Sequence, residues 1–85
     1  MEVLLIAYDL RKPNFTEGDY EPLYSRLGAL GARRVQESVW ALRTSETPKE
    51  IFGRLKPLLS GRDRLIVAMI GDCENLGGIN RIDEM

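Results

Sequence analysis

The chain has 85 residues, a mass of 9.6 kDa, 12 basic and 13 acidic residues, one cysteine and no histidine. This length suits one domain with a modest core, the lack of histidine excludes Ser-His-Asp, Cys-His and Cys/His zinc chemistry, and the net charge of −1 argues against binding nucleic acid by bulk electrostatics. Because neither a disulfide nor a zinc site can stabilise so small a core, we expect a symmetric homodimer.

The chain begins with an apolar, partly β-branched run, Val3 to Tyr8, bounded by Asp9 and the later Pro13. A short run of this kind predicts a strand buried on both faces, and therefore a central strand of a sheet. The run is too short for a transmembrane helix, and no basic segment precedes it as in a signal peptide. We therefore expect a cytoplasmic protein with no membrane partner.

An amphipathic helix is predicted after the loop formed by residues 10–18. We expect Asp19 to begin this helix and Gly31 to end it, with Pro22 tolerated in the first turn. Apolar residues at helical spacing mark the face that packs on the sheet, namely Tyr20, Leu23, Tyr24, Leu27 and Leu30.

Residues that favour strands dominate from Arg33 to Arg43, but the alternation of polar and apolar side chains slips between Glu37 and Val39. The slip is compatible with one long bent strand or with two short antiparallel strands. We favour two strands.

The second helix is expected to begin at Thr47, which can form a capping box with Glu50, and to end near Lys56, because Pro57 cannot continue it. Its buried stripe is expected to consist of Ile51, Phe52, Leu55, Leu58 and Leu59. A second continuous apolar run, Arg64 to Ile70, predicts the last strand.

The element order is therefore β-α-β-β-α-β, an α+β pattern that predicts a ferredoxin-like fold. We expect an antiparallel sheet with both helices on one face and with the first and last strands adjacent at its centre. A second copy of the chain is expected to cover the other face. Residues 1–71 form this domain and carry 11 basic and 9 acidic residues, whereas residues 72–85 form an acidic, glycine-containing tail with a net charge of −3.

Asp9 is the first candidate for a functional residue, because it ends a strand that is predicted to be central. Open α/β sheets place ligand-binding groups at such ends. The alternative is that Asp9 only caps the following loop as an Asx turn. One carboxylate per chain is a poor Mg²⁺ site, but two-fold symmetry could bring two copies together.

The arginines form the second candidate, since the planar guanidinium suits phosphate. They could equally be solvated side chains that protect an exposed strand edge. The residues concerned are Arg11, Lys12, Arg33, Arg34 and Arg43.

Two short patterns stand out, one at the end of the first strand and one within the second strand segment. Residues 8–10 read Tyr-Asp-Leu, and residues 34–40 read Arg-Val-Gln-Glu-Ser-Val-Trp. These segments resemble the Tyr-Asp-Ile and Arg-Val-Gln-x-Ser-Val-Phe patterns of CRISPR-associated protein two, the small subunit of the spacer-acquisition complex. The likeness covers roughly residues 1–71 and is similar in its long first loop to the stand-alone SinR-like relatives of that family.

The resemblance implies a ferredoxin-like homodimer in which Asp9 meets its symmetry mate near the interface and holds Mg²⁺ or Mn²⁺. It implies either a metal-dependent endonuclease acting on RNA or DNA or a non-catalytic protein that holds DNA. In the first case the catalytic residues would be Asp9 and Arg34, with Tyr8 and Ser38 in supporting positions.

Three features depart from the family. Glu37 stands where a neutral or basic residue is common, the overall charge is acidic, and residues 72–85 replace the usual strand-forming C-terminal segment with a glycine-containing acidic stretch. They favour a stand-alone relative over an acquisition subunit. The competing hypothesis is a non-catalytic dimeric scaffold whose tail, residues 72–85, docks a protein partner.

Overall fold

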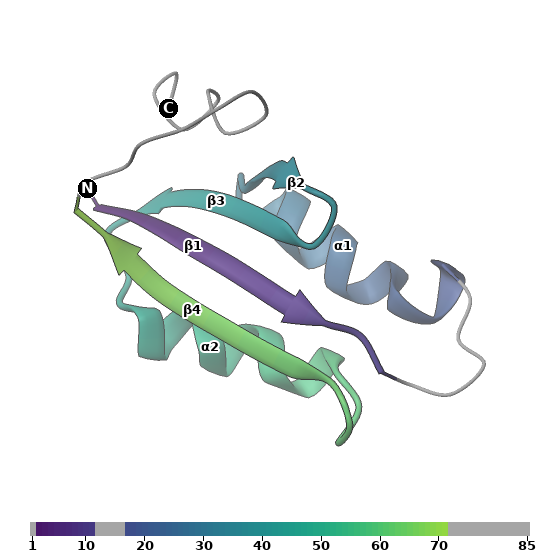
Figure 1. The fold of residues 1–85 in the computed structure, drawn as a ribbon. Coiled ribbons are helices and arrows are strands. Elements are labelled where there is room, and N and C mark those ends of the chain that lie inside the picture. The colour runs from purple at the N-terminus through teal and green to yellow at the C-terminus, as the bar shows by residue number, and fades with distance from the viewer. Residues whose placement is uncertain (1, 12–16, 72–85) are drawn as a thin grey trace.

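The computed structural model describes residues 2–11 and 17–71, which form a four-stranded antiparallel sheet and two helices (Figure 1). Lys12 and the acidic tail, residues 72–85, lie outside the described residues. The strands are β1 (Glu2–Asp9), β2 (Arg33–Gln36), β3 (Val39–Thr44) and β4 (Arg64–Ile70). The α-helices are α1 (Glu21–Ala29) and α2 (Pro48–Leu55), and two short 3₁₀ helices are η1 (Glu17–Tyr20) and η2 (Lys56–Leu58).

The sheet has the strand order β2-β3-β1-β4, and every neighbouring pair is antiparallel. The first and last strands are adjacent, as predicted, but of these two only β1 lies in the interior of the sheet, beside β3. The prediction that the last strand also lies at the centre is wrong, because β3 pairs with β1 on the opposite side and leaves β4 at the edge. Consequently the apolar run of β4 is not buried on both faces, and Ile66 and Met69 are 65% and 50% exposed.

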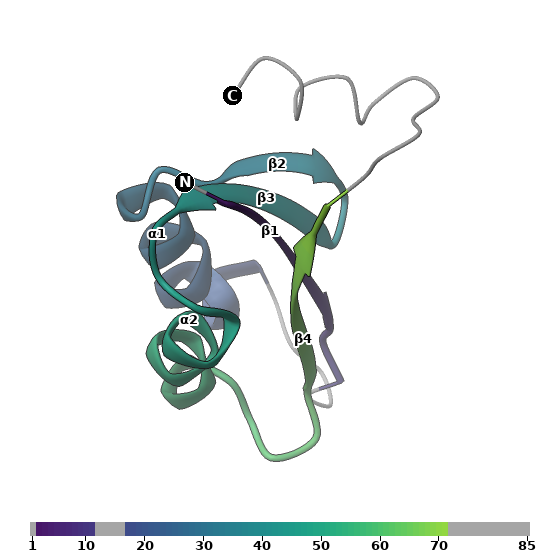
Figure 2. The same cartoon turned by 90° about the vertical axis from the view of Figure 1, so that its left-hand side faces the viewer.

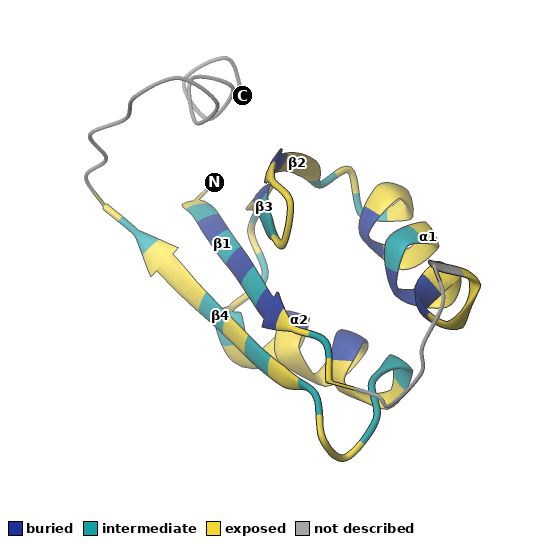
Figure 3. Ribbon diagram, turned by 45° about the vertical axis from the view of Figure 1, so that its right-hand side comes forward, coloured by how far each residue is buried: buried dark blue, intermediate teal, exposed yellow. Residues whose placement is uncertain are grey.

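Both helices lie against one face of the sheet (Figure 2). The core lies between these helices and that face, and its buried positions alternate along β1 (Figure 3). Alternation follows from the strand geometry, which directs successive side chains to opposite faces. The fully buried core residues include Leu4, Ile6, Leu23, Leu27, Leu42, Ile51 and Leu55.

The opposite face, which we call the open face, carries no helix among the described residues (Figure 2). A second apolar cluster lies there, with Val35 and Ala41 at its middle. The register of the strands adds side chains from β1, β3 and β4, so that the apolar residues of the open face are Val3, Leu5, Ala7, Val35, Val39, Ala41, Ile66, Ala68 and Ile70. The same register places the charged side chains of Asp9, Arg33, Arg43 and Arg64 on this face.

Local sequence signals explain most helix boundaries. Thr47 and Glu50 form the predicted capping box, and α2 gives way to η2 one residue before Pro57, as expected. After α1 the chain turns at Gly31, whose φ of 87° favours glycine. The predicted start at Asp19 is wrong, because residues 17–20 form η1 and the α-helix begins at Glu21.

Two further expectations concern the strands and the helix face. The segment that begins at Arg33 forms two strands, as favoured, and the expected slip after Glu37 is the turn between them. A further irregularity, which was not predicted, lies between Arg34 and Gln36. Phe52, predicted to be buried, is instead 37% exposed. None of the described helices is long and apolar enough to cross a membrane.

Candidate functional site

Asp9 ends β1 on the open face, since positions two apart on a strand share a face and Asp9 follows Leu5 and Ala7 at that spacing. It lies opposite Arg64 in the register, and its Oδ2 atom is 3.0 Å from Nε of Arg11. Both side chains of this ion pair are more than half exposed. Water therefore screens the pair, and a competing phosphate or cation could replace either partner at little cost.

A hollow of about 220 Å³ opens beside Asp9, where the end of β1 meets α1 and the turn between β2 and β3. All four residues that the resemblance placed in or beside an active site line this hollow. Tyr24 and Glu37 also line it, although the sequence assigned neither of them to a site. The complete lining is Tyr8, Asp9, Leu10, Tyr24, Arg34, Glu37 and Ser38.

Arg34 is held in one wall of this hollow by aromatic rings and by its own hairpin. Its guanidinium carbon lies 5.3 Å from the ring centre of Tyr24 and 5.6 Å from that of Trp40. Nε and Nη2 donate to the carbonyl oxygen of Glu37 at 2.9 and 2.5 Å. Arg34 thus stabilises the turn with two of the five N–H groups of its guanidinium, and its positive charge stays at the wall of the hollow.

Tyr8 connects the aromatic wall to the hairpin. Its hydroxyl accepts a hydrogen bond from Nε1 of Trp40 at 2.8 Å, and its ring centre lies 6.4 Å from that of Tyr24. Its amide donates to the carbonyl of Ser38 at 3.1 Å. Tyr8 therefore fixes Ser38 and the turn relative to β1, which is a supporting position rather than a chemical one.

The remaining predicted cations do not converge on Asp9. Arg43 lies opposite Val3, which is about 20 Å from Asp9 along β1 at 3.4 Å per residue. Arg33 is on β2, two strands away, opposite Ala41. Two of the described basic residues predicted to bind nucleic acid lie near Asp9. Arg11 forms an ion pair with Asp9, and Arg34 lines the same hollow.

Asp63 is an organising residue that the sequence reasoning did not identify. Its Oδ1 atom accepts from the amide of Arg11 at 2.6 Å and from the hydroxyl of Tyr20 at 2.8 Å, and Oδ2 accepts from the amide of Ser60 at 2.7 Å. Burial alone would raise the pKa of Asp63, but these hydrogen bonds outweigh it and hold the pKa below its ordinary value. The sequence Ser-Gly-Arg-Asp at residues 60–63 could have predicted the bond to Ser60, because the two residues are three positions apart. The other two bonds join distant segments and leave no local signal.

The donor set for a divalent cation is small. No group of three or more acidic or cysteine side chains that could hold a metal occurs within residues 2–11 and 17–71. Mg²⁺ usually takes one or two carboxylates together with phosphate oxygens and waters. Asp9 alone falls short of two carboxylates, whereas Asp9 with Glu37 in the same hollow, or with a second Asp9 from another copy, reaches that number.

No known protein-family model matches this chain.

Proposed function

We propose that this protein is a ferredoxin-like homodimer that binds the phosphate backbone of RNA or DNA and hydrolyses it with Mg²⁺ or Mn²⁺, as a stand-alone relative of the CRISPR-associated protein two family. The β-α-β-β-α-β element order and the strand order β2-β3-β1-β4 support the fold assignment. The two sequence patterns at residues 8–10 and 34–40 support the family assignment.

One observation carries the proposal: Asp9 lies on the open face, which carries the second apolar cluster and which no described helix covers. Two copies that bury these side chains against each other would each present Asp9 at the rim of the shared interface. Exposed Ile66 lies two residues from Arg64, the register partner of Asp9, so the apolar surface reaches close to the carboxylate. A metal site built on two Asp9 side chains would then need both copies.

The residues around Asp9 have distinct roles in this proposal. The carboxylates would hold the metal, which when bound supplies a positive charge that stabilises the phosphate and activates water. Arg11, released from its ion pair, would neutralise phosphate charge from the loop. Arg34 adds positive charge at the hollow, and Tyr8 and Ser38 keep its wall in place.

The proposal is tested by incubating labelled single-stranded RNA, single-stranded DNA and duplex DNA with the protein, with and without Mg²⁺ or Mn²⁺. We expect metal-dependent cleavage by the wild type and a loss of at least about 100-fold in Asp9→Asn, which keeps the shape of the side chain but removes its charge. Binding without metal should change little, because Asp9 is not expected to bind phosphate directly.

Two control variants sharpen this result. Glu2→Gln removes one charge from the other end of β1 and should leave cleavage unchanged. Glu37→Gln shows which side chain supplies the second carboxylate of the metal site. Unchanged cleavage favours two Asp9 side chains across a dimer. A loss of cleavage equal to that of Asp9→Asn favours Asp9 and Glu37 of one chain. Equal cleavage by the wild type and Asp9→Asn would show that the catalytic part of the proposal is wrong, and binding without cleavage would leave a non-catalytic nucleic-acid-binding dimer.

A further inference from the structure

The outer surface of α2 carries positive charge that the site beside Asp9 does not use. The helix has three faces, of which the first packs Ile51 and Leu55 into the core. The second face is polar, and its charged side chains, Glu50 and Arg54, bind partners at the start of the helix. The third face presents Lys49, Phe52 and Lys56, which recur at a spacing that keeps them together.

The acidic side chains of α2 and its N-terminal approach are already engaged. Glu50 is bonded to the amide and hydroxyl of Thr47 in the capping box, at 3.2 and 3.1 Å. Glu46 pairs with Arg54 at 2.7 Å. Neither Lys49 nor Lys56 forms an ion pair with any residue in the described part of the chain, so both ammonium groups are available to a ligand.

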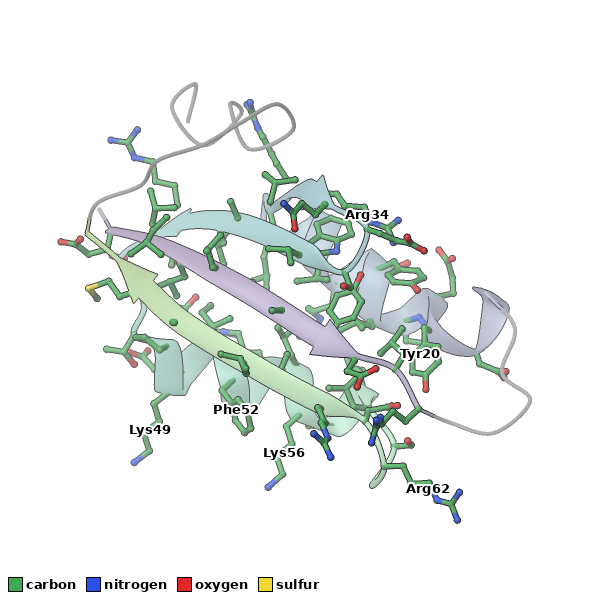
Figure 4. The ribbon with its side chains drawn as sticks, viewed as in Figure 1. Tyr20, Arg34, Lys49, Phe52, Lys56 and Arg62 are labelled. Carbon is green, nitrogen blue, oxygen red and sulfur yellow. The ribbon has the colours of Figure 1, made fainter. Side chains whose placement is uncertain are left out.

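Lys49, Phe52 and Lys56 extend in the same direction beneath β4, and Arg62 lies farther along, in the loop before β4 (Figure 4). The ring of Phe52 is 37% exposed between the two lysines. The lysines are seven residues apart, which is about 10 Å along a helix. We call these four residues the α2 basic strip.

The strip ends at an open hollow of about 580 Å³ at the loop that precedes β4 in the sequence. Arg62 lines this hollow together with Arg11 and Arg64. Asp63 also lines it, but its oxygens accept the three hydrogen bonds described above and hold the loops together. Since Arg11 also pairs with Asp9, the hollow connects the strip to the carboxylate at the end of β1.

We infer that the α2 basic strip binds single-stranded nucleic acid, with Lys49, Lys56 and Arg62 on phosphates and Phe52 stacked on an unpaired base. The combination of a cationic track with an exposed aromatic ring is what sequence-tolerant binding of single strands requires, and a duplex would not offer a free base face. This inference rests on the proposed function, because it assumes that the ligand is nucleic acid. It adds the path by which a strand reaches Asp9.

The test measures the anisotropy of fluorescein-labelled twelve-nucleotide oligothymidylate and oligouridylate over a range of salt concentrations, without divalent metal. In Lys49→Gln/Lys56→Gln we expect the slope of log K against log salt to fall in magnitude by about 1.4, since each cation on a single strand contributes about 0.7. In Phe52→Leu, which stays apolar, we expect affinity to fall about fivefold or more through lost stacking.

Gly53 offers a variant that adds charge without crowding. It lies on the same face as the lysines, and a Cβ at this position would meet no atom within 4 Å. Replacing glycine inside a helix also favours folding. Gly53→Glu should therefore weaken binding while Gly53→Gln does not. Arg26→Gln/Arg54→Gln is the matched control, because it removes the same charge from residues outside the strip.

Circular dichroism and thermal unfolding establish that each variant is folded. Weaker binding and a smaller salt slope in the strip variants, but not in Arg26→Gln/Arg54→Gln, support the inference. If the wild type binds oligonucleotides and the strip variants bind equally well, or lose no more than that control, the inference is wrong and the proposed function stands. If the wild type binds no RNA or DNA, both fail. Binding of labelled polyglutamate is measured in the same way. If the strip variants lose binding to polyglutamate but not to the oligonucleotides, the strip recognises an acidic protein and the inference is overturned.

Discussion

One side chain, that of Asp63, connects segments that are far apart in the sequence by hydrogen bonds. Asp63 receives hydrogen bonds from Arg11, 52 positions earlier, and from Tyr20, 43 positions earlier. These bonds join the loop after β1 and the end of η1 to the loop before β4. Because Arg11 is the ion-pair partner of Asp9, the position of the candidate site depends on a carboxylate that lies outside it.

The lowered pKa of Asp63 makes its contribution to stability depend on pH. The folded-state pKa lies below the unfolded-state value of about 3.9, so the unfolded chain binds the proton more readily. The stabilisation is complete above about pH 4 to 5 and is lost as pH falls through the folded-state pKa. We expect Asp63→Ala to lower the free energy of unfolding by about 1–3 kcal/mol at pH 7.

Urea unfolding of the wild type and Asp63→Ala between pH 7 and pH 2 measures this difference. It should be constant from pH 7 to about pH 5 and shrink below about pH 4. Glu2→Ala removes an exposed acid at the start of β1 and serves as a comparison. A difference between the wild type and Asp63→Ala that does not depend on pH would contradict the assignment of the charged carboxylate as the acceptor.

At the scale of one element, α2 shows how local chemistry and tertiary position act separately. Thr47, Pro48 and Glu50 determine where the helix begins, and Pro57 limits where it ends. The exposure of Phe52 has a different origin. The helix packs beside β4, which is an edge strand, so the sheet ends beneath the helix and leaves its outer flank uncovered.

The capping box gives a prediction for this element. Thr47→Ala removes the hydroxyl that accepts from the amide of Glu50 at 3.2 Å. We expect the free energy of unfolding to fall by about 1 kcal/mol, with Thr47→Ser close to the wild type. Urea denaturation measures both. Equal losses in Thr47→Ala and Thr47→Ser would show that the methyl group, and not the hydrogen bond, is responsible.

At the scale of the whole molecule, the main feature is a sheet with helices on one face and apolar side chains on the other (Figure 2). Val35 and Ala41 on this face are buried, but Ile66 is 65% exposed. An exposed apolar patch usually marks an interaction site. The proposed homodimer would bury it, and it would leave the α2 basic strip on the outside, because the strip lies on the helix side of the sheet.

Two substitutions on β4 test the dimer. Ile66, 65% exposed, is on the open face, whereas Met69, 50% exposed, shares the helix side with Leu4. We expect Ile66→Lys to dissociate the dimer, because it would bury an unpaired charge in the interface, and Met69→Lys to leave it intact. Sedimentation velocity reports the mass directly. A monomeric wild type, or equal dissociation in both variants, would contradict the proposed interface.

The sequence alone determined the element types and their order, because strand runs, helical spacing, the Thr47 cap and Gly31 are local signals. It also singled out residues 8–10 and 34–40, six of whose members line one hollow. The tertiary structure decided which strand lies at the edge, how Arg34 meets Tyr24 and Trp40, and that Asp63 ties distant loops together. Those contacts depend on strand pairing and helix placement, which spacing along one chain does not specify.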